Sequence, residues 1–556
     1  MSKYRKRKAV YDVPSTPFET WVANIWLIAV IVFVPLVFHN YYYDILPFKY
    51  HFLLCANCLA FAALVLRFFM SENKTESENL VDSIKAKLNS MNFVEQAVLI
   101  FIIIYTVSTL TAGRYMRQAF MGNEGRYNGL LLMGTYAILY FLLKGHIKFH
   151  RHMITLFLIA GLLICLFGIT DYFSLDILKF KVQMSRTQVN DFTSTIGNIN
   201  TYTTYVGQVI AVSGTLFMLS PADFKKTKGE GSILRLLFYY LCMSLGFMAL
   251  AMGKSDNGYL TLGAFFGFLP FVAWKTRRGF RRYLITLATY FSVIKIIGII
   301  NLKFAGQVIG IYGLYQYIAE FKYMTYAVVF LWAAALIAAV IDYKTSAEGA
   351  ELTPVLRWFW LGVLLLIIFF TGYLFYKANT DSDFAASKLG AAKEYFVFND
   401  SWGTNRGYIW RAALEEYFKL SPIHKIFGSG PETFGIYMMA LRYEDMVVKT
   451  SQVFDNVHNE YIQFLFTIGP FGLLAYLIMT LGTAYICLKS WFKKLVDEEE
   501  GRYLVAAAFM IVCYAAQATV NLYIPITSCL VWAFMILSAG MLKKVKFPPL
   551  FKVNKK

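Results

Sequence analysis

The stretch DNVHNEYIQFLFTIGPFGLLAYL, Asp455 to Leu477, decides the fold because it turns from polar to apolar within a few residues. Before it lies the only long polar segment of the sequence, roughly residues 377–456, and after it begins an apolar run. That run is long enough to cross about 30 Å of hydrocarbon as a helix. The stretch therefore marks the junction between a large loop and a membrane-spanning helix, and His458 lies at this junction.

The composition places most of the chain in a membrane. Hydrophobic residues make up 58% and charged residues 16% of it, whereas soluble domains carry about 45–50% apolar and about 25% charged residues. Apolar runs of about 18–22 residues recur, which is the length of a spanning helix. We therefore predict an all-α fold, a polytopic transmembrane helical bundle of about 12–14 spans with one large helical extracytoplasmic loop. The expected span centres lie near residues 30, 60, 101, 136, 164, 210, 243, 266, 292, 333, 367, 474, 512 and 532.

The net charge of +19 is distributed as a topology signal. Basic residues gather in short loops at every second turn, namely 3–8, 144–151, 225–228, 275–282, 489–494 and 543–556. Such loops stay on the cytoplasmic side, so we expect both termini inside the cytoplasmic membrane and the long polar segment outside. A nucleic-acid partner is excluded, because it would need a coherent basic surface with aromatic or motif context. The first apolar run lacks a small-residue cleavage site and is expected to remain as a span.

Three parts follow along the chain. We expect an N-terminal transmembrane bundle over residues 1–376, an extracytoplasmic catalytic loop over 377–457, and C-terminal transmembrane helices with a basic cytoplasmic tail over 458–556. Within the loop, apolar residues at helical spacing predict an amphipathic helix over 405–420, which Ser421-Pro422 would stop. A second short helix is expected over 432–442.

His458 is the first candidate for chemistry. Histidine changes its charge near neutral pH and is suited to proton transfer. An ionisable side chain at the membrane's edge is costly and suggests function by default. The alternative is a hydrated interfacial histidine that donates a hydrogen bond to a lipid headgroup.

Arginines on the outer side form the second set, because positive-inside statistics disfavour them there. They are Arg114, Arg117, Arg126, Arg186, Arg406, Arg411 and Arg442. A guanidinium holds phosphate oxygens in a bidentate fork, so several could cradle a lipid diphosphate. The alternative is headgroup contact or ion pairing, as for Arg411 with Glu415 four residues on. Arg406 and Arg411 point about 140° apart on a regular helix, and Arg406 lies at the helix start beside free backbone N–H groups.

Two outer polar turns complete the candidates. Asn198 and Asn200, in Thr195–Asn200, open the sixth expected span, where they either cap a helix or bind sugar hydroxyls. In the turn 253–258 the lysine and aspartate are more often solvated than catalytic. No zinc, nucleotide or paired acidic metal motif occurs, and the seven cysteines are interpreted as small apolar residues in or near spans. We therefore expect no metal and no cofactor.

At this point the pattern resembles the O-antigen ligase and polysaccharide polymerase family of bacterial membrane glycosyltransferases. GTNRGYIWRAALEEYFKLSPIHKIFGSGPETF, residues 403–434, is similar to the family's Arg-x-x-x-Trp helix followed by a Gly-rich turn and Phe. VHNEYIQFLFTIGPFGLLAYL, residues 457–477, resembles its His-Asn helix entry with a following Gly-x-x-Gly. GNEGRYNGLL and STIGNIN resemble its Arg-containing outer loop and Gly-Asn-x-Asn element.

The resemblance implies a GT-C-like fold and a metal-independent, inverting transfer of a glycan from an undecaprenyl-diphosphate donor. It gives His458 the role of base and Arg406 the contact to the donor diphosphate. Arg126 is implied as a second phosphate contact, and Arg411, Arg186, Asn198, Asn200 and Asn459 complete the expected substrate-binding set. The implied partners are the lipid-linked glycan, a glycan or lipid acceptor, and the bilayer.

Two positions depart from the family pattern. Ser255-Asp256 stands where relatives often carry Ser-Arg, which puts a third arginine contact in doubt, and Thr467 stands where relatives often carry an acidic residue. Rival classes are a lipid-glycan flippase, which would more often show inverted repeats, and a non-catalytic membrane scaffold. Ligase and polymerase share the same donor chemistry, so the motifs leave both open.

Overall fold

The computed structural model describes residues 17–70, 80–182, 184–185, 188–222, 229, 231–345 and 350–552. Helices dominate them, and two short strands, β1 (Phe192–Thr193) and β2 (Gly197–Asn198), pair antiparallel. The first half contains α1 (Pro17–Ile28), α2 (Val34–Leu36), α3 (Ile45–Met70), α4 (Leu80–Ser90), α5 (Phe93–Thr111), α6 (Met116–Met121), α7 (Leu130–Leu143), α8 (Arg151–Tyr172), α9 (Ile199–Leu219), α10 (Ile233–Met252), α11 (Gly258–Phe268), α12 (Pro270–Ala273) and α13 (Arg277–Lys303). The second half contains α14 (Gly313–Glu320), α15 (Met324–Thr345), α16 (Val355–Thr380), α17 (Ser382–Lys388), α18 (Lys393–Phe396), α19 (Trp402–Lys419), α20 (Pro422–Phe427), α21 (Phe434–Thr450), α22 (Glu460–Phe492), α23 (Glu498–Ala518) and α24 (Pro525–Met541).

Ten helical segments in the described part of the chain are long and apolar enough to cross a membrane. Shorter apolar helices lie at 130–143, 258–273 and 525–541. Together with α9, these segments contain every span centre expected from the sequence. The chain is an all-α polytopic membrane protein.

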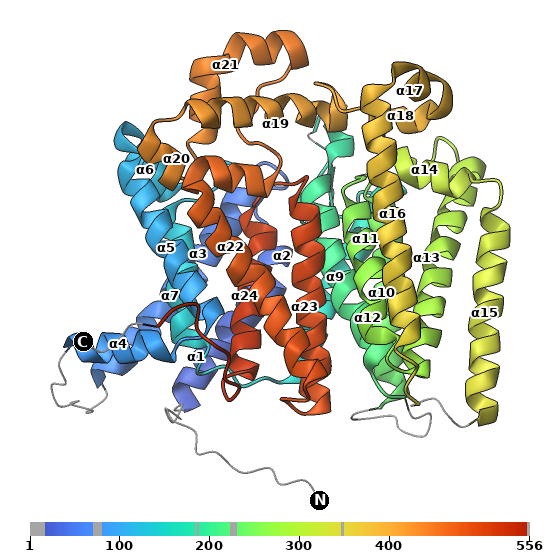
Figure 1. The fold of residues 1–556 in the computed structure, drawn as a ribbon, viewed down its shortest axis with the longest axis horizontal. Helices are drawn as coiled ribbons and strands as arrows, with labels where there is room; N and C mark the ends of the chain where they lie inside the picture. The colour runs from blue at the N-terminus through green and yellow to red at the C-terminus, as the bar shows by residue number, and fades with distance from the viewer. Residues whose placement is uncertain are drawn as a thin grey trace, which may run out of the picture.

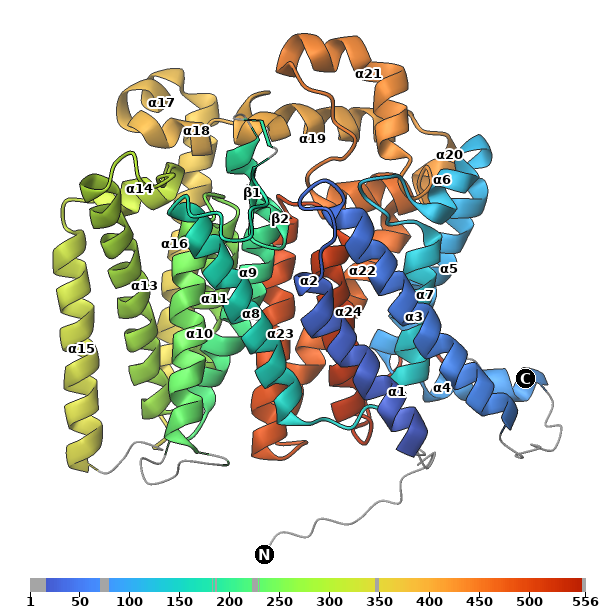
Figure 2. The same ribbon diagram turned by 180° about the vertical axis from the view of Figure 1, so that it is seen from behind.

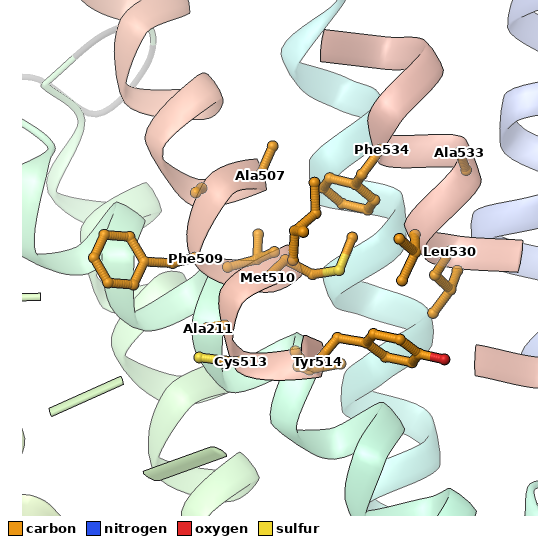
Figure 3. Packing of buried hydrophobic residues seen from close by; sticks show 14 of the residues in the cluster. Ala211, Ala507, Phe509, Met510, Cys513, Tyr514, Leu530, Ala533 and Phe534 are labelled. Atoms are coloured by element: carbon orange, nitrogen blue, oxygen red, sulfur yellow. The ribbon is translucent and has the colours of Figure 1, made fainter. Parts of the chain in front are cut away.

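The centre of the bundle is built around α9, α22 and α23. Every α9 residue from Thr201 to Leu219 is buried, because α8, α10, α11 and α23 pack around the helix. Figure 3 shows one layer of this core, in which Met510 and Tyr514 of α23 lie near Leu530 and Phe534 of α24. By contrast α15 stands at one edge of the bundle and α16 runs along its front face in Figure 1. The apolar side chains of both helices are exposed, as expected of lipid-facing helices (Figures 1 and 2).

The helices of the large loop, α17 to α21, lie over one end of the bundle, opposite the end at which α1 begins (Figures 1 and 2). Between α16, which ends at Thr380, and α22, which begins at Glu460, α19 crosses above the transmembrane helices. A small separate core made by α19, α21 and the start of α22 holds the loop together, with Tyr408, Ile409, Phe434, Met438 and Phe466 among its members.

The loop helices differ in detail from those expected. The first, α19, begins at Trp402, but residues 403–405 adopt left-handed backbone angles, so a regular helix starts only at Arg406. Pro422 ends one helix as predicted and also begins another, α20, because proline is tolerated in the first turn of a helix. The second expected helix, 432–442, starts at Phe434 and continues to Thr450.

Several sequence expectations lie outside the described residues. These are Arg186, the basic residues 3–8 and 225–228, and the last part of the basic tail, 553–556.

Candidate functional site

A cavity of about 1200 Å³ lies where the large loop meets the ends of the transmembrane helices beneath it. The loop contributes Tyr395, Trp402, Arg406 and His458, among others, to its wall. The bundle contributes the start of α9, the α10–α11 turn, the start of α14 and the segment after α23, through residues that include Asn200, Lys254, Ser255, Asp256, Asn257, Tyr312, Leu314 and Val520. The loop therefore covers a polar chamber at the membrane surface.

His458 lines this cavity from the turn that precedes α22. Its backbone is left-handed, with φ of 54°, and its N–H donates to Asn456 Oδ1 at 3.0 Å. The adjacent carbonyl of Val457 accepts from Trp410 Nε1 at 3.1 Å, which ties the turn to α19. Such a conformation is uncommon for a residue other than glycine and persists where its surroundings enforce it. The turn thus holds the imidazole at the cavity wall.

Arg406 reaches the same cavity from the start of the regular part of α19. Its Nε donates to the carbonyl of Val520 at 3.1 Å and its Nη1 to the carbonyl of Gly403 at 2.6 Å. These two bonds fix the plane of the guanidinium. Among the residues that the structure describes, Nη2 of Arg406 has no hydrogen-bond partner. The N–H groups of Nη2 can therefore donate to a ligand.

The charge of Arg406 acts on the imidazole of His458. Burial, followed by the positive charges of Arg406 and Arg126, lowers the pKa of His458 to about 3, while Asp455 opposes this effect. Burial lowers the pKa of Arg406 to about 10, so the guanidinium stays charged at neutral pH. The empty site therefore combines a neutral imidazole with a fixed cation, the protonation states that a base and an anion-binding group need.

Arg126 lies next to this pair but does not line the cavity. Its Nη2 forms an ion pair with Asp455 Oδ1 at 2.8 Å, and its Nε is buried without a partner in the described residues. Glu432 belongs to the same cluster, and burial raises the pKa of its carboxyl to about 7 although Arg126 acts in the opposite direction. Asn123, from the α6–α7 connection, donates to the Glu432 carbonyl. The cluster joins that connection to the large loop.

The structure does not bring the remaining candidates together at the cavity. Arg411 points outward, with its side chain 48% exposed, and pairs with Asp400 at 2.5 Å and with Glu415 at 4.0 Å. Asn459 caps α22 by accepting from the N–H groups of Tyr461 and Ile462, and Asn198 caps α9 by accepting from Asn200 N–H. Asn200 itself lines the cavity, whereas Arg411, Asn198 and Asn459 do not. Substrate contact by Arg411, Asn198 and Asn459 stays a prediction.

The cavity also contains residues that the sequence did not single out. Asp256, expected to be solvated more often than functional, accepts hydrogen bonds from Tyr395 Oη at 2.7 Å and Leu314 N–H at 3.3 Å. It therefore connects the α10–α11 turn to α18 and to the start of α14. Trp402 packs on Trp410 with ring centroids 5.3 Å apart. Trp402 and Trp410 both lie in α19, whereas the Asp256 contacts join segments far apart in the sequence, and no local pattern signals them.

In the described residues no group of three or more His, Cys, Asp or Glu side chains is arranged to hold a metal ion. Sequence comparison gives a match to a known family. Residues 323–477 match the sequence profile described as O-antigen ligase, and no curated protein matches the chain significantly. The matched segment runs from the α14–α15 connection through the large loop into α22, so it contains both Arg406 and His458. Residues 323–477 of this multi-pass membrane protein are therefore similar to the O-antigen ligase family.

Proposed function

We propose that the protein is a membrane glycosyltransferase that moves a glycan from an undecaprenyl-diphosphate donor to an acceptor hydroxyl on the extracytoplasmic face, in the manner of an O-antigen ligase. The observation that carries the proposal is that His458 and Arg406, from different parts of the family-matched segment, line one cavity beneath the loop helices. The match to the O-antigen ligase family supports this reaction class.

In the proposed reaction, the acceptor oxygen attacks the anomeric carbon and the bond from that carbon to the donor phosphate oxygen breaks. The electron pair of the broken bond stays on undecaprenyl diphosphate, and the acceptor proton moves to a ring nitrogen of His458. Attack from the face opposite the leaving group inverts the anomeric configuration. Arg406 binds the diphosphate and stabilises the charge that develops on it, which a fixed guanidinium does without a metal ion.

Donor binding also improves His458 as a base. In the empty site the positive charges of Arg406 and Arg126 contribute to its low pKa. A diphosphate beside these guanidiniums would offset their potential, and a nearby negative charge favours the protonated imidazole. The base therefore gains proton affinity when the donor is in place, and this couples donor binding to proton removal.

The test is glycan transfer by the purified full-length protein with a lipid-linked oligosaccharide in the presence of EDTA. We expect His458→Ala and Arg406→Ala each to lower the rate by about 10²–10⁴, the range for loss of a general base or of a charge-stabilising donor. His424→Ala is the matched control: His424 lies in the same loop, but its Nε2 contacts the Thr111 carbonyl at 3.1 Å and it does not line the cavity. Wild-type rates in His458→Ala would reject the assignment of the base.

A polysaccharide polymerase of the same family is the second candidate, because it uses the same donor chemistry. Glycan analysis of a deletion strain separates the two activities. Unlinked long chains indicate a ligase, whereas single repeat units indicate a polymerase. A lipid-glycan flippase would only move the glycan across the membrane, so covalent attachment to a new acceptor distinguishes the enzyme from a transporter.

A further inference from the structure

A part of the cavity wall that the proposed reaction does not use carries a second cation. Lys254 lies in the α10–α11 turn, and its left-handed backbone, with φ of 56°, directs the residue to the cavity wall. Its Nζ lies 6.0 Å from the centroid of the Tyr312 ring, which also lines the cavity. Among the described residues, no carboxylate forms an ion pair with this ammonium.

The charges around Lys254 leave its ammonium poorly compensated. Burial and the positive charge of Lys181 lower the pKa of the ammonium to about 8, and Asp191 opposes them only in part. Asp256, two residues further on, already accepts hydrogen bonds from Tyr395 and Leu314. A partly buried cation without a bonded counter-charge is costly unless a ligand supplies that charge.

Asn200 presents a second donor on the same wall. Its Oδ1 accepts from Ser255 Oγ at 2.6 Å and from Asn257 Nδ2 at 3.1 Å. Because the Asn257 amide nitrogen can only donate, these two bonds fix the side-chain oxygen of Asn200 on that side. The Nδ2 group of Asn200 is then left with no partner in the described residues. Asn200 can therefore still donate hydrogen bonds through Nδ2.

We propose that Lys254 and Asn200 form a second oxyanion subsite of the cavity, which binds a phosphate or carboxylate group of the glycan donor. The inference rests on the proposed function, since it assigns a ligand to the same chamber. Both free groups are donors, and the nearby acceptors Asp256 and Asn200 Oδ1 are already engaged. Asp191 also lines the cavity and offsets the charge of Lys254 in part, but it forms no ion pair with Lys254 in the described residues. The oxyanion belongs either to the donor diphosphate, shared with Arg406, or to an acidic sugar of the glycan. In both cases the subsite selects substrates by negative charge.

The test compares full-length wild type with Lys254→Met in two measurements. The first is binding of undecaprenyl diphosphate without sugar. The second is kcat/KM for two lipid-linked donors that differ only in carrying a hexuronic acid or the corresponding neutral hexose. Lys322→Met is the matched control, because Lys322 is an exposed lysine of the α14–α15 connection outside the cavity wall. Lys254→Arg keeps the charge and should retain most of the binding.

If the oxyanion is the diphosphate, Lys254→Met weakens binding of undecaprenyl diphosphate by about tenfold or more, as expected for a charge-assisted hydrogen bond. If it is an acidic sugar, that binding is unchanged, and kcat/KM falls by a similar factor for the acidic donor only. Wild-type values in both measurements would overturn the subsite.

Should Lys254→Met fail to fold, Lys254→Gln compared with Lys254→Arg gives the same contrast. The activities of His458→Ala and Arg406→Ala separate the two proposals. If these variants lose activity while Lys254→Met behaves as wild type, only the subsite is wrong. If they remain fully active, the proposed function itself is wrong.

Discussion

At the scale of single residues, the site depends on the charges that surround one imidazole. His458 is placed by its neighbours' hydrogen bonds, and its proton affinity is lowered by burial and by two guanidiniums. A histidine in water has a pKa of about 6.5, so the protein has moved this group away from the range in which it would titrate at neutral pH. The same environment raises the pKa of the Glu432 carboxyl. The pKa of His458 is lowered and the pKa of Glu432 is raised, and each shift leads to its own prediction.

The first prediction concerns the pH dependence of activity. Because the pKa of His458 is about 3 in the free enzyme, its imidazole stays neutral from pH 8 to pH 5. The profile of kcat/KM, which reports on the free enzyme, should therefore show no acid limb from this histidine near pH 6.5. Measuring the profile in Glu432→Gln as well removes the carboxyl that titrates near pH 7. An acid limb with a pKa near 6.5 that persists in this variant would contradict the prediction.

The second prediction concerns stability. Glu432 has a folded-state pKa of about 7, above its ordinary value of 4.5, so the folded protein binds the proton more tightly than the unfolded chain. The stabilising contribution is complete below about pH 4.5 and is lost as the pH rises through 7. The melting temperature of wild type relative to Glu432→Gln should therefore fall between pH 5 and pH 8. A difference that does not change with pH, or that rises, would show that the buried carboxyl is ionised.

At the scale of elements, the break in α22 connects the loop to the bundle. Gly469 interrupts the helix with φ of 72°, and the carbonyls that the break exposes find new partners. The Phe466 carbonyl accepts from Ser429 N–H at 2.9 Å and the Thr467 carbonyl from Gly430 N–H at 3.0 Å. A Cβ on Gly469 would lie 2.1 Å from the Ile426 carbonyl oxygen. These hydrogen bonds hold the segment after α20 against α22, the helix that begins just after His458.

The third prediction follows from this contact. Gly469→Ala should destabilise the protein by at least about 2 kcal/mol, since it adds a strained backbone to a clash with rigid backbone atoms. Gly372→Ala is the control, because Gly372 lies within α16 and its Cβ would meet no atom within 4 Å. Thermal melting of both variants in one detergent measures the difference. Equal melting temperatures would show that the protein accommodates the methyl group added at residue 469 without strain.

Sequence patterns predicted the individual elements better than their contacts. Helical spacing identified most of α19, and Ser421-Pro422 marked its end, because these signals are local. The left-handed residues before Arg406 and the break at Gly469 were missed. The break depends on a close approach of the Ile426–Gly428 backbone, which no local pattern signals. Residue type and position made His458 and Arg406 candidates, and the structure places both at one cavity, while their catalytic roles stay a prediction. Lys254 and Asp256 were set aside, because only the folded chain places their turn beside Tyr395 and Tyr312.

At the scale of the whole molecule, apolar runs predicted the helices, whereas the orientation expected from the basic loops stays a prediction. Each expected centre lies in a helix because a run of this length has few alternatives in a bilayer. The sequence did not reveal which helices face lipid. Both α9 and α16 are helical, but α9 is buried at the centre whereas α16 is exposed on a face of the bundle. The cavity also follows only from the assembled helices.

The fourth prediction tests the orientation. Ser387→Cys places a thiol at an exposed position of α17, and Glu351→Cys places one at an exposed position between α15 and α16. Since the basic loops are expected inside, a membrane-impermeant maleimide should label only the first variant in cells whose cell membrane is intact. Both should react after permeabilisation, with the unsubstituted protein as the background. Labelling of Glu351→Cys in intact cells would show that the orientation in the membrane is opposite to the expected one.

The central claim is that His458 and Arg406 act as a unit on one bound donor. Its most direct test is the rate of glycan transfer by wild type, the two single alanine variants and the double variant. Groups that act together are not additive, so we predict that the double variant is about as slow as the slower single variant. A double variant whose loss equals the product of two independent losses, or a His458→Ala variant with the wild-type rate, would contradict the account.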